Sequence, residues 1–189
     1  LHLTDLGDAY AVEVGTEAGK ALLGKYADYR DATADEMAHK DDLQTSKVKH
    51  FADRLNFDSV ELPSMLGDAF KHSYWDELEE RCFACGSCTN VCPTCYCFNV
   101  TDTISLDQTE SVRERTWDSC QLDAFARVAG GENFREERTQ RQRHRFLRKG
   151  KYIYEQLGML GCVGCGRCIR TCLVHINIVD GFNTIHETK

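Results

Sequence analysis

Proline, basic residues and long apolar runs are all scarce in this chain. Only 2 of its 189 residues are proline, and no run approaches the roughly 18 apolar residues that a membrane-spanning helix needs. Its 23 Lys and Arg against 30 Asp and Glu give a net charge of −7, which disfavours a dedicated nucleic-acid binder. No secretory signal is recognisable, and Leu1 in place of methionine predicts a trimmed start. We expect a globular protein of one or two domains with no membrane span and no nucleic-acid partner.

Cysteine is absent from the first 80 residues, which are acidic. Alternating residues predict a strand over 9–14, and a helix is expected over 17–23 with Gly24 as its cap. The segment GTEAGK is one residue too short for a phosphate loop, and no G-x-G-x-x-G follows a strand. We therefore predict no flavin or nucleotide site in this chain. The dense mixed charges of residues 31–55 are typical of a solvated helix or a linker.

Beyond this acidic part the pattern favours helices. After Ser64, a candidate N-cap, apolar residues recur at four-residue spacing: Leu66, Phe70, Tyr74 and Leu78. This spacing predicts one helix that leads directly to the first cysteines. Further helices are expected over 117–128, ended by Gly130, and over 136–157, ended by Gly158.

The cysteines indicate a metal protein. There are 11, and all except Cys120 fall into two groups, at residues 82–97 and 162–172. An odd number in closely spaced groups does not fit a secreted disulfide framework. In a reducing compartment such groups bind metal, so we predict a cytoplasmic metalloprotein.

Two runs of four cysteines share the spacing C-x2-C-x2-C-x3-C. This is the spacing of bacterial two-cluster ferredoxins, in which the fourth cysteine of each run binds the other cluster. It predicts two 4Fe-4S clusters. The expected ligands are Cys82, Cys85, Cys88 and Cys172 for the first cluster, and Cys162, Cys165, Cys168 and Cys92 for the second. Zinc, which takes two separated pairs of ligands, is the weaker alternative.

The surroundings of the two runs predict the fold. Gly86, Gly164 and Gly166 lack a Cβ, so the loop backbone can approach a cluster and direct N–H groups at its sulfur atoms. The largely helical sequence between the runs favours a helical ferredoxin-like domain over a compact ferredoxin. We expect a mainly α fold, with a dicluster domain over 63–189. Residues 1–62 are interpreted as the tail of a small α/β domain with a charged linker.

Cys95, Cys97 and Cys120 lie outside the two runs of four. They could form a third metal centre, supply an alternate ligand beside Cys92, or simply be small buried side chains. The sequence leaves these alternatives open.

Residues 135–151 carry a local charge of +6. A basic helix beside an anionic cluster would ease its reduction. A surface for a partner and a merely solvated helix are the alternatives. His144 and His175 are isolated, and His175 is expected to donate to a sulfide or to pack rather than to bind iron.

Longer phrases resemble a known family. They are FACGSCTNVCPTCYCFNVTDT, WDSCQLDAFARVAGGENFR, RQRHRFLRKGKY and GCVGCGRCIRTC. These phrases resemble the iron-sulfur β subunit of cytoplasmic sulfhydrogenases, which are NAD(P)-linked NiFe hydrogenases, and also the related iron-sulfur protein of anaerobic sulfite reductase. The resemblance is strong from about Tyr74 to Asp180. Nearer the start, GDAYAVEVGTEAGK looks like the tail of that family's N-terminal domain.

The resemblance implies an electron-transfer subunit of an anaerobic complex. Its two clusters would relay electrons between a catalytic subunit, hydrogenase by preference, and a flavin or NAD(P) subunit. The chain itself shows no acid-base pair, activated nucleophile or open metal position, so any catalysis would belong to the complex. A relay subunit of sulfite reductase or another anaerobic reductase is one alternative, and a structural or regulatory module that binds iron-sulfur clusters or zinc is another.

Overall fold

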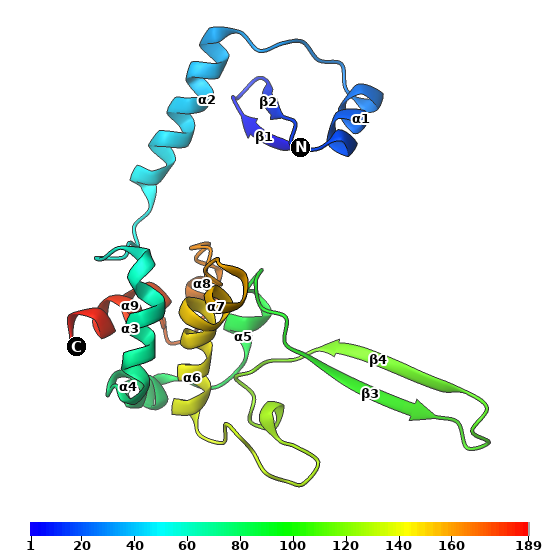
Figure 1. Ribbon diagram of the computed structural model, residues 1–189, viewed down its shortest axis with the longest axis vertical. Helices are drawn as coiled ribbons and strands as arrows, with labels where there is room; N and C mark the ends of the chain where they lie inside the picture. The colour runs from blue at the N-terminus through cyan, green and yellow to red at the C-terminus, as the bar shows by residue number, and fades with distance from the viewer. Residues whose placement is uncertain (189) are drawn as a thin grey trace. The chain divides into compact units, whose positions relative to one another are not determined.

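The computed structural model describes residues 1–188, and the chain divides into two compact units. The first is Leu1–Ala52 and the second begins at Asp53. In chain order the strands and α-helices are β1 (His2–Asp5), β2 (Tyr10–Glu13), α1 (Glu17–Tyr26), α2 (Ala34–Lys47), α3 (Leu62–Asp68), α4 (Tyr74–Arg81), α5 (Ser87–Asn90), β3 (Phe98–Ile104), β4 (Ser111–Trp117), α6 (Arg138–Leu147), α7 (Ile153–Leu157), α8 (Arg167–Arg170) and α9 (Ile178–Glu187). The predicted mainly α fold is confirmed (Figure 1).

The first unit is a short antiparallel hairpin followed by two helices. Strand β2 lies within the segment predicted as a strand and pairs with β1 through Leu3 and Val12. Helix α1 begins after Thr16, whose side chain accepts a hydrogen bond from the backbone of Gly19. The helix continues through Gly24 to Tyr26, so the expectation of a Gly24 cap was wrong.

Helix α2 shows why residues 31–55 carry mixed charges. Thr33 and Glu36 form a capping box at its start, and Arg30 pairs with the Glu36 carboxylate at 2.7 Å. Farther along, the buried Lys40 ammonium lies 3.0 Å from the Glu13 carboxylate on β2. The segment predicted as a solvated helix or linker is therefore largely a helix with one side chain anchored on the hairpin.

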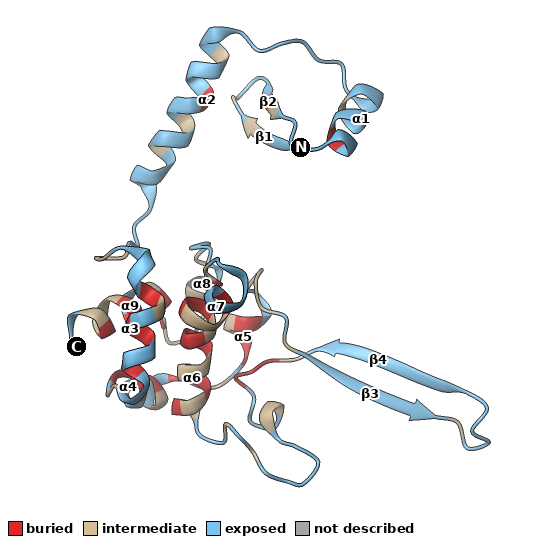
Figure 2. Cartoon of the chain, in the orientation of Figure 1, coloured by how far each residue is buried: buried red, intermediate tan, exposed pale blue. Residues whose placement is uncertain are grey.

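The second unit has a helical core built from α3, α4, α6 and α9, whose buried faces are drawn in red in Figure 2. Phe146 on α6 is at its centre, with ring centroids 5.5 Å from Trp75 and 5.4 Å from Phe182. Both contacts are edge-on, the arrangement that aromatic rings favour.

The single helix predicted to run from Ser64 to the first cysteines is in fact two. A 3-10 turn, Ala69–Lys71, separates α3 from α4. The buried indole of Trp75 donates a hydrogen bond to the carbonyl of Ala69 at 2.7 Å, and the His72 ring accepts one from the backbone of Tyr74. Leu66 and Leu78 are buried as expected, whereas Phe70 is 48% exposed.

The predicted helix over 117–128 was also wrong. Trp117 ends strand β4, and only the 3-10 turn Asp123–Ala126 follows. Around Ser119, side chains compete for the backbone: Asp118 accepts from the Ser119 N–H, and the Ser119 hydroxyl accepts from the Gln121 N–H. Such local bonds replace the bonds that would continue a helix.

Strands β3 and β4 form a hairpin that projects from the helices and is exposed along its whole length (Figures 1 and 2). The register pairs Phe98 with Trp117 at its base. The backbone N–H of Asp118 donates to the carbonyl of Cys97 just below that pair. The hairpin thereby holds residues 97 and 118–120 together.

The helix predicted over 136–157 is continuous but changes pitch. Helix α6 passes into a π-helical segment, Arg148–Tyr152, and then into α7. Gly150 in the π segment packs so closely on α3 that a Cβ there would lie 2.3 Å from Leu66. Gly158 adopts a left-handed conformation and ends α7, as predicted.

Candidate iron-sulfur centres

The two cysteine runs fold in the same way. Each begins with a loop, makes a left-handed turn at Gly86 or Gly166, and enters a short helix, α5 or α8. The two helices pack against each other. Gly164 also has a positive φ of 66°, and Ala84 at the matching position of the first run adopts a φ of 54°. The role predicted for these glycines is consistent with the backbone.

The first cavity is lined by one of the predicted ligand sets. Its volume is about 30 Å³, and its cysteines are Cys82, Cys85, Cys88 and Cys172. Cys172 belongs to the second run in the sequence, so the packing of α8 against α5 brings it to the first run.

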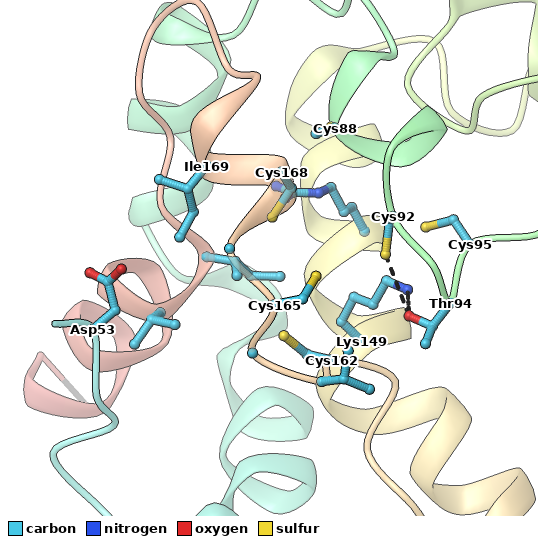
Figure 3. A pocket seen from close by; sticks show the side chains of 16 residues that line it. Asp53, Cys88, Cys92, Thr94, Cys95, Lys149, Cys162, Cys165, Cys168 and Ile169 are labelled. Atoms are coloured by element: carbon cyan, nitrogen blue, oxygen red, sulfur yellow. Dashed lines mark hydrogen bonds between the residues drawn. The ribbon is translucent and has the colours of Figure 1, made fainter. Parts of the chain in front are cut away.

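The second cavity, of about 80 Å³, contains the other predicted set. Cys162, Cys165, Cys168 and Cys92 line it, with Cys88 and Cys95 at its edge (Figure 3). Cys88 and Arg145 line both cavities, so a single layer of side chains separates them. All eight cysteines predicted as ligands thus lie around two neighbouring cavities.

Hydrogen-bond donors point at the sulfur atoms of the first cavity. The backbone N–H groups of Ala84 and Ile176 lie 3.3 Å from the sulfur atoms of Cys82 and Cys172, respectively. The buried Gln142 amide donates to Cys82 at 2.8 Å. Such donors stabilise negative charge on thiolate sulfur. His175 is exposed, and it is the next backbone N–H, rather than the predicted histidine side chain, that reaches Cys172.

Two buried cations line these cavities. Arg145 is 5% exposed and Lys149 is 4% exposed. Within residues 1–188 neither forms an ion pair with a carboxylate. Burial opposes the charge of Arg145, but thiolates at Cys88 and Cys168 raise the pKa of its guanidinium. Lys149 donates to the Thr94 hydroxyl at 2.6 Å (Figure 3).

These cations fit an anionic cofactor. A buried charge without a partner is strongly unfavourable, whereas a cubane with four thiolates carries negative charge and would compensate it. The donor set of four soft thiolates per cavity is also the set that iron-sulfur clusters take. The residues present therefore fit the predicted clusters.

The thiols differ in how readily they ionise. A hydrogen bond from Cys95 lowers the pKa of Cys92 to about 4, and the Ser87 hydroxyl lowers the pKa of Cys85. Burial raises the pKa of Cys88 and of Cys162. Cys92 and Cys85 are thus the thiols best prepared to act as thiolate ligands.

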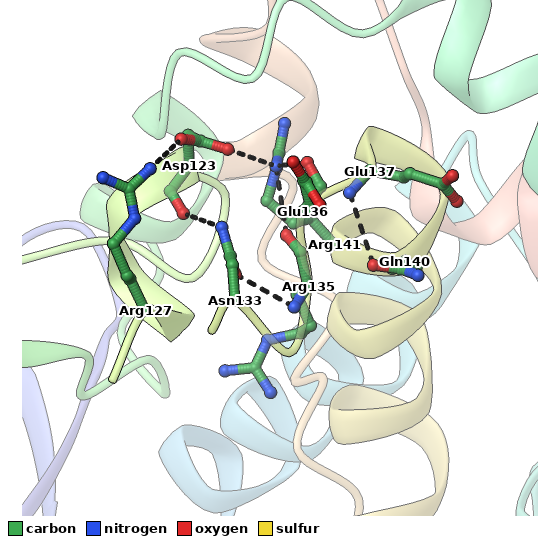
Figure 4. A network of polar contacts seen from close by, with 8 residues as sticks. All are labelled: Asp123, Arg127, Asn133, Arg135, Glu136, Glu137, Gln140 and Arg141. Carbon is green, nitrogen blue, oxygen red and sulfur yellow. Dashed lines mark hydrogen bonds and ion pairs between the residues drawn. The ribbon is translucent and has the colours of Figure 1, made fainter. Parts of the chain in front are cut away.

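Basic residues on α6 have two different surroundings. Arg141 is directed away from the cysteines, and its guanidinium lies 3.4 Å from the Asp123 carboxylate and 3.1 Å from the Arg135 carbonyl (Figure 4). It also donates to the carbonyl of Glu136. Arg145, one helical turn later, lines the cavities instead. The interpretation of residues 135–151 as a merely solvated helix was wrong for this face.

Sequence reasoning missed several polar residues of the site. Gln142, Gln121 and Ser119 are buried beside the cysteines. Gln142 donates to Gln121, which in turn donates to the carbonyl of Arg141. Their only sequence signal is a polar residue on an otherwise apolar face of α6, which does not show that it meets sulfur.

This arrangement defines a protein with two four-iron clusters. The chain belongs to the 4Fe-4S dicluster domain family, whose model matches residues 81–176. It is also 35% identical over 184 residues to sulfhydrogenase 2 subunit beta of Pyrococcus furiosus. The match covers 95% of this chain but 54% of the relative, so the chain spans about half of that protein's length. No solved structure matches the chain.

These matches confirm the resemblance found in the sequence. The chain is an iron-sulfur electron-transfer protein homologous to a sulfhydrogenase β subunit, and its domain type implies two 4Fe-4S clusters. In the described part of the chain, no helix has the length and apolar character needed to cross a bilayer.

Proposed function

We propose that this chain is the electron-relay subunit of a cytoplasmic, anaerobic hydrogenase complex. It would pass electrons between a flavin subunit that binds NAD(P) and a NiFe catalytic subunit. The observation that carries the proposal is the pair of adjacent cavities, each lined by four cysteines and separated by Cys88 and Arg145. The 35% identity to a sulfhydrogenase β subunit supports the choice of hydrogenase.

The proposed ligand sets are those expected from the sequence. Cys82, Cys85, Cys88 and Cys172 would hold the first cluster. Cys162, Cys165, Cys168 and Cys92 would hold the second. When bound, each cluster supplies a site that accepts and releases one electron.

The other side chains tune and shield these sites. The N–H groups of Ala84 and Ile176 and the amide of Gln142 would stabilise the added negative charge of a reduced cluster. Arg145, shared by both cavities, would favour reduction of both. Helices α6 and α9 cover the inner side and limit access of water to the cluster nearest the core.

The test is made on the assembled complex. Cys85→Ser should abolish electron flow from hydrogen to NAD(P), because it removes an exposed ligand of the first cluster. Reduction of an artificial dye directly at the catalytic subunit should continue, which separates a broken relay from a damaged catalyst. Hydrogen-dependent NAD(P) reduction at the parent rate would contradict the proposal. Nickel should copurify with the complex, and sirohaem in its place would assign it to sulfite reduction.

A further inference from the structure

The cysteines outside the two proposed ligand sets share a third cavity. Cys95, Cys97 and Cys120 all line a space of about 280 Å³, larger than either of the other two. Cys95 precedes β3, and Cys120 follows β4. The hairpin pairing and the bond from the Asp118 N–H to the Cys97 carbonyl bring them together although 23 residues separate Cys97 from Cys120.

The wall of this cavity is strongly cationic. Arg145, Arg148 and Lys149 line it, and no aspartate or glutamate among the described residues does. Arg145 and Lys149 are almost completely buried. Three positive groups around three thiols favour an occupant that is anionic and binds soft sulfur ligands.

His144 is the remaining metal-ligating side chain on this wall. Its imidazole is half-buried on α6, and its ring lies 6.3 Å from that of Tyr152. Within residues 1–188 the ring makes no hydrogen bond to another residue. Its nitrogen is therefore free to bind a metal.

We propose that this cavity binds a third iron-sulfur cluster, with Cys95, Cys97 and Cys120 as thiolate ligands and His144 at the fourth iron. A single metal ion fits less well, because no three His, Cys, Asp or Glu side chains of the described part converge closely enough to hold one. A cubane spreads its ligands over a wider space, as the size of this cavity allows.

The site extends the line of the other two. Thr94, Cys95, Arg145 and Lys149 line both the second and the third cavities. The third cluster would therefore be a direct neighbour of the second and not of the first. It would add one more one-electron site to the chain, at the base of the exposed hairpin.

The test compares metal content in the full chain and its variants, reconstituted in parallel with iron and sulfide under anaerobic conditions. The parent should contain about twelve irons and twelve sulfides, against about eight for two cubanes. The variant with Cys95, Cys97 and Cys120 all replaced by alanine should lose about four of each. An unchanged iron content in that variant, or one zinc lost in place of iron, would overturn the proposal.

Matched variants guard against a folding defect. Cys97→Ser alone, at a half-buried position, should remove the same four irons while the spectra of the two other clusters remain. Cys165→Ser should remove four irons from the second cavity and leave the third centre in place, so a failure of the proposed relay is distinguishable from a failure of this inference. Pulsed EPR of the reduced parent should show a nitrogen coupling that disappears in His144→Ala. Persistence of that coupling in the variant would overturn the assignment of His144.

Discussion

Arg145 is the residue on which the electrostatics of this protein depend most. Its guanidinium is 5% exposed and lines all three cavities. The sequence showed only that this segment is basic. That one of its arginines faces sulfur while Arg141, four residues earlier, faces Asp123 follows from which side of α6 each occupies.

Arg145→Gln should lower the reduction potentials of both clusters. Removal of a nearby positive charge disfavours the extra electron, by roughly 100 mV for a separation of about 6 Å at an effective dielectric constant near 20. Redox titration followed by EPR measures the shift. Arg143→Gln is the control, because Arg143 on the same helix stacks over Phe70 and lines none of the cavities. Equal potentials in the parent and Arg145→Gln would contradict this role.

At the scale of elements, the long helix α6 to α7 positions the site through its π segment. Its extra residue per turn places Gly150 against Leu62 and Leu66 of α3. Lys149, next to it, faces the cavities and accepts a hydrogen bond from the Gly161 N–H at its carbonyl. The sequence predicted a helix here, but its change of pitch depends on these tertiary contacts.

Gly150→Ala should destabilise the second unit by about 1–3 kcal/mol, because the added methyl group overpacks the core. Without this contact, alanine would favour a helix. Gly67→Ala on α3 is the matched control, since its Cβ would meet only the flexible end of Lys151, at 3.3 Å. Chemical denaturation should show a loss for Gly150→Ala only. An equal midpoint for both variants would count against the packing argument.

At the scale of the whole molecule, two features join distant parts of the chain. One is the convergence of Cys172 with the first cysteine run. The other is the packing of residues 53–57 on α9. There the Asn56 N–H donates to the Asn183 side chain at 3.0 Å, and Phe57 stacks on His186 at 4.2 Å.

The crossed ligation predicts opposite effects for two neighbouring cysteines. Cys172→Ser should remove the first cluster, and Cys168→Ser should remove the second, although both lie in the second run. EPR and Mössbauer spectra of the two variants distinguish the clusters. Loss of the same cluster in both variants would show that each run binds its own cluster.

The boundary between the units can be tested by truncation. A fragment that begins at Asp53 should keep its clusters and unfold like the full chain, because it retains every contact to α9 described above. A fragment that begins at Pro63, close to the division proposed from the sequence, should be less stable by roughly 1–3 kcal/mol. Thermal unfolding of both fragments measures the difference. Equal melting temperatures would place residues 53–62 outside the folded unit.

The sequence by itself determined the chemistry of this protein. Ligand spacing within a run is a local property, so C-x2-C-x2-C-x3-C predicted the clusters and their loops, and Gly158 predicted the end of α7. Only the tertiary structure decided what surrounds the sulfur. The burial of Arg145 and Lys149, the hairpin in place of the helix predicted from Trp117, and the meeting of Cys97 with Cys120 all depend on contacts between segments far apart in the chain. Local propensity contains no information about such contacts.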